Sequence, residues 1–421
     1  MKGSEWGFET LSVHAGVASG EHLGATAVPI YGSVSFAYDS AEELADIFGR
    51  KKSGFIYSRV ANPTVNAYEQ RITALEGGAG TIATSSGMSA IATVIFALCS
   101  SGDEILCGES LFGGTIQLFE RIFVKYGVSI RYLDTDDLEA VRSAISSRTR
   151  LVFIETLGNP KLDVPDLKGL AALLAVRKIP LVADCTFTTP YLCRAGELGA
   201  ALVVHSATKY LTGNGSVVGG VLVDTGTFDW SDCGHEEIET AVRQIGPELA
   251  FLSVARRHVF QNTGCCLSPF NAYLHLLGVE TLALRMEKHC SNALALAQSL
   301  CDHPIVKQVN YPGLDRSRYH NLAKAQFGDR YGGLLTFELA SRDQAYRFID
   351  ALKLAKNLAN LGDAKTLVIH PASTLYRDCT PEQTAHAGVT DRMIRVSVGI
   401  ENSNDIINDF DQALRSTGGI R

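Results

Sequence analysis

The chain has 421 residues, a net charge of -7 and a pI of about 5.9, so neither nucleic acid nor an anionic membrane is expected as its main partner. Hydrophobic residues make up 46% and charged residues 20%, the balance of an ordinary soluble globular protein with room for two domains. The N-terminal residues contain no apolar stretch of a secretory signal, and the longest apolar run, residues 90–98, is too short to span a bilayer, so a cytoplasmic protein is expected.

The 10 cysteines are scattered and form no CxxC pair. This spacing suits no zinc site, and a chain of this size needs no disulfides, so no metal is expected and reduced, mostly buried thiols are predicted. Cys185, which follows Asp184 directly, is interpreted as a small core residue.

Residues 1–65 are rich in glycine, serine and aromatic residues and show no periodic pattern. The absence of periodicity predicts an irregular arm, without a core of its own, that lies on another surface.

Residues 66–270 alternate between helical and strand patterns. Helices are predicted at 66–75, 115–126, 137–145 and 167–177, with a further apolar helix that is opened by residues 86–88 and ends near 98 and a helical turn near 196. Strands are predicted at 104–107, 129–132, 151–155, 180–183, 202–204 and 220–223. Because such alternation builds parallel sheets covered by helices on both faces, we expect an α/β fold with a mostly parallel central sheet.

Residues 271–421 have a different character. A long helix is predicted over 280–300, followed by strands at 334–339 and 394–398 and helices at 342–352 and 404–414. This mixture predicts a smaller C-terminal α+β domain.

Lys209 follows the apolar strand 202–204, and hydroxyl residues Ser206 and Thr208 precede it. One interpretation is a lysine that caps the end of a strand. The other is a Schiff-base lysine that holds pyridoxal 5′-phosphate (PLP), with the hydroxyls on the phosphate.

Several polar residues follow other strands of the predicted sheet. Glu155 ends one strand, with Asn159 just after it, and Asp184 ends the next. Ligands of open α/β sheets bind beyond the carboxyl ends of the strands, so these residues and Lys209 are expected to share a site.

PLP needs a lysine, an anion that keeps its pyridine nitrogen protonated, a phosphate cradle and a stacking ring. Asp184 offers the anion and Phe112 the ring. Ser86, Gly87 and Met88 open a helix whose first backbone amides suit a phosphate.

Arg395 lies inside an apolar strand pattern, where a charge is costly unless it is paired. It suits a bidentate grip on the α-carboxylate of an amino acid. An internal ion pair with Glu401 is the alternative.

These motifs together resemble those of the PLP-dependent enzymes of Cys/Met metabolism, which include cystathionine γ-synthase, the cystathionine lyases, methionine γ-lyase and O-acetylhomoserine sulfhydrylase. The resemblance rests on residues 57–59, 62–64, 85–90, 155–160, 184, 206–210 and 395–401 and extends from about 10 to 414. Residues 227–230, 267–272, 310–314 and 358–364 are most similar to the O-acetylhomoserine sulfhydrylase branch.

The resemblance implies the fold of the aspartate aminotransferase-like (fold type I) enzymes and a homotetramer built from two tight dimers. It implies that Tyr57 and Arg59 reach the phosphate in the neighbouring subunit, that Tyr57 assists catalysis, and that Asn159 and Asn360 contact the substrate. The family usually has tyrosine where this chain has Phe112, so stacking is kept and a hydroxyl is lost.

The reaction implied by the resemblance is γ-replacement on O-acetyl-L-homoserine by a sulfur nucleophile, which gives homocysteine or methionine and acetate. Sulfide, a small thiol and a sulfur-carrier protein all remain possible donors. Cystathionine γ-synthase or methionine γ-lyase activity is the alternative within the family, and a non-catalytic metabolite-binding protein is the alternative outside it.

Overall fold

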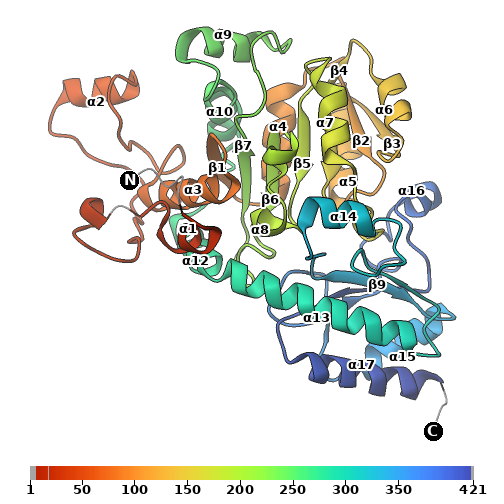
Figure 1. Cartoon of the computed structure of the whole chain (residues 1–421). Helices are drawn as coiled ribbons and strands as arrows, with labels where there is room; N and C mark the ends of the chain where they lie inside the picture. The colour runs from red at the N-terminus through yellow and green to blue at the C-terminus, as the bar shows by residue number, and fades with distance from the viewer. Residues whose placement is uncertain (1–5, 18, 419–421) are drawn as a thin grey trace.

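The computed structural model describes residues 6–17 and 19–418 and contains two β-sheets (Figure 1). The larger sheet has 7 strands in the order β1-β7-β6-β5-β4-β2-β3. Its strands are β1 (Gly80–Thr84), β2 (Glu104–Gly108), β3 (Ser129–Leu133), β4 (Thr149–Glu155), β5 (Leu181–Asp184), β6 (Leu202–Ser206) and β7 (Gly220–Asp224). Only β7 runs antiparallel to its neighbours, which confirms the mostly parallel sheet.

Helices cover both faces of this sheet, because its central strands are apolar on both sides. Helix α4 (Gly87–Leu98) packs on one face, and α3 (Pro63–Glu76) and α7 (Leu167–Ala175) pack on the other. The remaining helices of this part are α5 (Gly113–Arg121), α6 (Leu138–Ala144), α8 (Thr189–Leu192), α9 (Glu236–Ile245), α10 (Ala250–Val254) and α11 (Gln261–Thr263).

The smaller sheet has 5 strands in the order β10-β11-β12-β9-β8. These are β8 (Gln308–Asn310), β9 (Leu334–Glu338), β10 (Lys356–Asn357), β11 (Leu367–Ile369) and β12 (Met393–Ser397). The C-terminal helices are α12 (Pro269–Glu280), α13 (Leu282–Asp302), α14 (His320–Phe327), α15 (Arg342–Ala351), α16 (Pro381–His386) and α17 (Ser403–Gly418). In Figure 1 the long helix α13 lies beside this sheet, with α15 and α17 at the lower edge of the molecule.

The division of the chain into three parts, with boundaries after residues 65 and 270, stays a prediction. Residues 1–5, 18 and 419–421 lie outside the described residues. Helix α12 packs on α3 of the larger domain, and α13 contacts both α8 and β9. The change in sequence pattern after residue 270 therefore coincides with α12 and α13, which connect the part of the chain around the larger sheet to the smaller sheet.

Residues before 66 are less irregular than expected. They contain α1 (Phe8–His14) and α2 (Ala41–Phe48). Helix α3 begins earlier than predicted because the side chain of Asn62 accepts the Thr64 amide and Pro63 occupies the first turn.

The single helix predicted over 115–126 is wrong. Helix α5 ends at Arg121, and a 3-10 turn follows over Phe123–Tyr126. The tighter turn ends at Gly127, whose φ of 83° lets the chain reverse into β3. Strand β1 was not predicted, because its short sequence, with glycine and two threonines, shows no clear period.

None of the helices in the described part of the chain is long and apolar enough to cross a membrane. The 10 cysteines are free, and Cys185 is a buried core residue as expected.

A close approach between β7 and the start of α4 places two parts of the site together. A Cβ on Gly220 would lie 2.2 Å from the Ser86 carbonyl oxygen, and a Cβ on Gly87 would lie 2.7 Å from the Ser206 Cβ. Only glycine therefore fits at these two positions.

Gly220→Ala should lower the free energy of unfolding by about 1–3 kcal/mol, because the methyl group must push β7 and α4 apart. Urea unfolding measures the change. Gly32→Ala, where no atom lies within 4 Å of the added Cβ, is the matched control. Equal stability of the two variants would contradict this account of the close approach.

Candidate active site

A cavity of about 280 Å³ lies between the carboxyl ends of β4, β5 and β6, the start of α4 and loops of the smaller domain. All predicted site residues except Tyr57 and Arg59 line it, namely Ser86, Gly87, Met88, Phe112, Asn159, Asp184, Ser206, Thr208, Lys209, Asn360 and Arg395. Residues around the larger sheet and residues around the smaller sheet therefore contribute to one site.

Lys209 follows β6, and its Nζ donates a hydrogen bond of 2.6 Å to Oδ1 of Asn360. Burial, and then the positive charge of Arg395, lower the pKa of Lys209 to about 8. Much more of this amine is therefore uncharged near neutral pH than of an exposed lysine, which favours a nucleophilic role.

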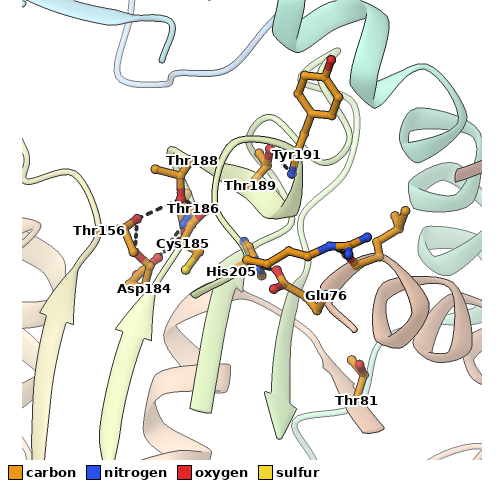
Figure 2. Close-up of polar contacts among 12 residues, drawn as sticks. Glu76, Thr81, Thr156, Asp184, Cys185, Thr186, Thr188, Thr189, Tyr191 and His205 are labelled. Carbon is orange, nitrogen blue, oxygen red and sulfur yellow. Dashed lines mark hydrogen bonds and ion pairs between the residues drawn. The ribbon is translucent and has the colours of Figure 1, made fainter. Parts of the chain in front are cut away.

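Asp184 ends β5 and is held by the turn that follows (Figure 2). Its Oδ1 accepts the Thr186 amide at 2.9 Å and the Thr186 hydroxyl at 2.5 Å. Burial raises the pKa of Asp184, and the bonds from Thr186 oppose that rise. A cationic partner in the cavity would keep this carboxylate ionised.

The start of α4 and the end of β6 form the anion-binding end of the cavity. Ser86 caps α4 in a capping box with Ser89, and the first amides of a helix lack intrahelical partners. The amides of Gly87 and Met88 are thus available to an anion. Ser206 and Thr208 add hydroxyl groups to the same cavity.

Arg395 is 3% exposed on β12. It donates hydrogen bonds of 3.1 Å to Oδ1 of Asn159 and to the Asn360 carbonyl oxygen. Its Nε has no partner among the described residues, and burial lowers its pKa to about 10. A buried guanidinium held by neutral oxygens is suited to an incoming carboxylate.

The alternative ion pair between Arg395 and Glu401 is not formed. The Glu401 carboxylate accepts the amide and the hydroxyl of Thr366 instead.

Phe112 precedes α5 and is 38% exposed. Its amide donates to Oε1 of Glu155 at 2.5 Å, and both residues line the cavity.

Thr186 and Leu375 are among the lining residues that had no predicted role. Thr186 could have been found from its place two residues after Asp184, where a side-chain turn is common. Leu375 also lines the cavity, but nothing in its local sequence indicates this.

Tyr57 and Arg59 lie away from the cavity of their own chain. Tyr57 is 43% exposed and forms an isolated bridge with Ser35, and the Arg59 guanidinium donates to the Gln261 carbonyl.

Within residues 6–17 and 19–418, no group of 3 or more His, Cys, Asp or Glu residues is arranged to hold a metal ion. The cavity instead combines an amine, a buried carboxylate, an anion-binding helix start and a guanidinium.

Known proteins that resemble this chain in sequence include a family of enzymes and several of its members. Residues 9–415 match the family model described as Cys/Met metabolism PLP-dependent enzyme. The chain is 41% identical to the homocysteine synthase of Schizosaccharomyces pombe, over 97% of this chain and 98% of that protein. It is 40% identical to the O-acetyl-L-homoserine sulfhydrylase of Corynebacterium glutamicum, over 97% and 96% of the two chains.

Among solved structures, one from Campylobacter jejuni superposes with a TM-score of 0.91 at 34% identity, covering 97% of this chain and 100% of that one. That protein is described as an O-acetylhomoserine (thiol)-lyase, and it carries a pyridoxyl-lysine 5′-monophosphate.

Removing the charge of Arg395 should raise the pKa of Lys209, because a nearby cation disfavours the protonated amine. Labelling of cofactor-free protein with an amine reagent across pH, read lysine by lysine by mass spectrometry, should show the shift in Arg395→Met. Arg392→Met is the control, because Arg392 directly precedes β12 and is paired with Glu338. An unchanged profile at Lys209 would mean that burial alone sets its pKa.

Proposed function

The chain belongs to the Cys/Met metabolism PLP-dependent enzymes, and from this premise we propose that it replaces the acetate of O-acetyl-L-homoserine by a sulfur nucleophile in methionine biosynthesis. The observation that carries the proposal is the single cavity in which Lys209, Asp184 and Arg395 meet. The product is homocysteine with sulfide, or methionine with methanethiol.

The residues of the cavity fit PLP. Lys209 supplies an amine of lowered pKa for the covalent link, and Asp184 supplies the anion for the pyridine nitrogen. Ser206, Thr208 and the start of α4 suit the phosphate. When bound, PLP supplies an electron sink that stabilises negative charge on carbon atoms near the substrate amino group.

Arg395 would bind the substrate carboxylate and so fix the orientation of the amino acid. Lys209 Nζ would accept the Cα proton and later return it, since its pKa lies near the working pH. Oδ1 of Asn360, which accepts a hydrogen bond from this amine, would keep it on the reacting side of the cavity.

The rest of the cavity wall favours an acetyl ester. Leu157, Val218 and Leu375 make it apolar, and of the described residues that line it only Lys209 and Arg395 are cationic. Both cations already have a role, so the free carboxylate of a succinyl ester would lack a partner. An apolar wall also limits the access of water that would compete with the sulfur nucleophile.

We further propose the homotetramer, a dimer of dimers, in which Tyr57 and Arg59 complete the phosphate site of a neighbouring subunit. Neither residue lines the cavity of its own chain, and Tyr57 is exposed, which supports this. The sulfur donor, whether a small molecule or a sulfur-carrier protein, would enter the same cavity.

Purified protein loaded with PLP should form acetate and homocysteine from O-acetyl-L-homoserine and sulfide. Turnover with O-succinyl-L-homoserine should be far lower, because the second carboxylate has no cation to receive it. Product analysis with each ester and with sulfide or methanethiol tests the proposal. Equal use of both esters would refute the acetyl assignment, and the absence of any γ-replacement would refute the function.

Arg395→Ala should lower kcat/KM while PLP remains bound. The loss of transition-state stabilisation should be about 2–3 kcal/mol, the contribution of a charged hydrogen-bonded contact. Steady-state kinetics and the visible spectrum of the cofactor measure the two effects. Arg392→Ala, which lies outside the cavity, should leave both unchanged. Loss of the cofactor from Arg395→Ala would show that this arginine serves the fold of the site instead.

Mixing Arg59→Ala subunits with Lys209→Ala subunits should restore part of the activity, since one site of a mixed dimer would then be intact. Sulfhydrylase activity after subunit exchange is the measurement. If exchange is proven by mass spectrometry and no activity returns, Arg59 acts within its own chain.

A further inference from the structure

Two carboxyl groups lie side by side at the edge of the larger sheet. Glu155 ends β4, Asp184 ends β5, and the two residues are directly paired in the parallel register. Paired residues of neighbouring strands point to the same face, with the strands about 4.8 Å apart. Both side chains line the cavity, and Glu155 is only 7% exposed.

Two negative charges this close are unfavourable in a buried site, so one of the two groups retains a proton. The hydrogen bonds decide which one. Asp184 accepts two bonds from Thr186, of 2.9 and 2.5 Å, and bonds of this kind stabilise the ionised form. Glu155 accepts a single bond, from the Phe112 amide.

Lys209 and Arg395, the cations that line the same cavity, are bonded to Asn360 and Asn159 and form no ion pair with Glu155. Asp163, in the loop that follows, and Asp184 are acidic, and Tyr376 approaches from the smaller domain. No Lys, Arg or His of the described residues forms an ion pair with Glu155. Burial first, and then the charge of Asp184, raise the pKa of Glu155 well above its usual range.

We propose that Glu155 is held as an uncharged carboxylic acid, which fixes the Phe112 turn through its carbonyl oxygen and leaves Asp184 as the single anion facing the cofactor. The part of this inference that concerns Asp184 rests on the proposed function. Glu155 is thus a positioning residue: it acts through Phe112 and through Asp184.

If Glu155 is uncharged, glutamine at this position should preserve its hydrogen bonding. Its amide oxygen can accept the Phe112 N–H, and its NH₂ group donates where the acid has its O–H. Alanine removes the acceptor and frees the turn. Glu104 offers a matched control, because it is also 7% exposed and bonded to neutral groups, the hydroxyls of Ser146 and Thr149, but lies at the far end of β2.

The protonation state can be measured without any turnover. The infrared spectrum of the holoenzyme at neutral pH should contain the C=O stretch of a protonated carboxyl group that is lost in Glu155→Gln and kept in Glu104→Gln. Failure to lose such a band in Glu155→Gln overturns the proposal. This readout is independent of the reaction catalysed, so it separates failure here from failure of the proposed function.

The positioning role is tested by PLP binding. Glu155→Gln should bind PLP almost as tightly as the unmodified chain, whereas Glu155→Ala should bind it on the order of tenfold more weakly, the cost of about one hydrogen bond. Fluorescence titration of cofactor-free protein gives both constants. If Glu155→Gln is as impaired as Glu155→Ala, the carboxylate form is required and the proposal is wrong. If neither variant is impaired, Glu155 has no positioning role.

Discussion

The parallel arrangement of β4, β5 and β6 is the constraint on which the rest of the site depends. Their carboxyl ends meet at one edge, so Glu155, Asp184 and Lys209, which are far apart in the chain, share one cavity. The close contact of Gly220 and Gly87 with their neighbours then brings the start of α4 to the same edge. Without this edge, each polar residue would be an isolated end of a strand.

The cavity contains few charged groups, and apolar side chains form much of its wall. Lys209 and Arg395 are cations whose pKa values are lowered, first by burial, and Asp184 is an acid whose pKa burial raises. The two asparagines let these charges coexist: Asn360 holds the lysine amine and, through its carbonyl, the arginine, while Asn159 holds the arginine from the other side. A cofactor and an amino acid substrate would complete this balance, because each brings an anion where the chain offers donors.

Sequence reasoning reached the lysine, the aspartate and the arginine because each stands at a place where a polar side chain is costly without a partner. The sequence did not decide whether Arg395 binds a substrate carboxylate or pairs with Glu401. The residue that hydrogen-bonds to Glu401 in the structure is Thr366, which is distant in the sequence. The helix break at 122 was missed because its cause, the reversal at Gly127 into β3, lies outside the helical pattern. The cavity wall formed by Leu375 depends on the packing of the two domains, which no local pattern encodes. The protonation of Glu155 depends on its register with Asp184, which becomes visible only when the strands are aligned.

The central claim is that Lys209 is the residue that holds the cofactor covalently. Borohydride reduction of the PLP-loaded protein, followed by proteolysis and mass spectrometry, tests it most directly. A pyridoxyl group is expected on Lys209 and none in Lys209→Ala, with Asn360 and Arg395 intact in both proteins. A stable pyridoxyl group on any other lysine would contradict it.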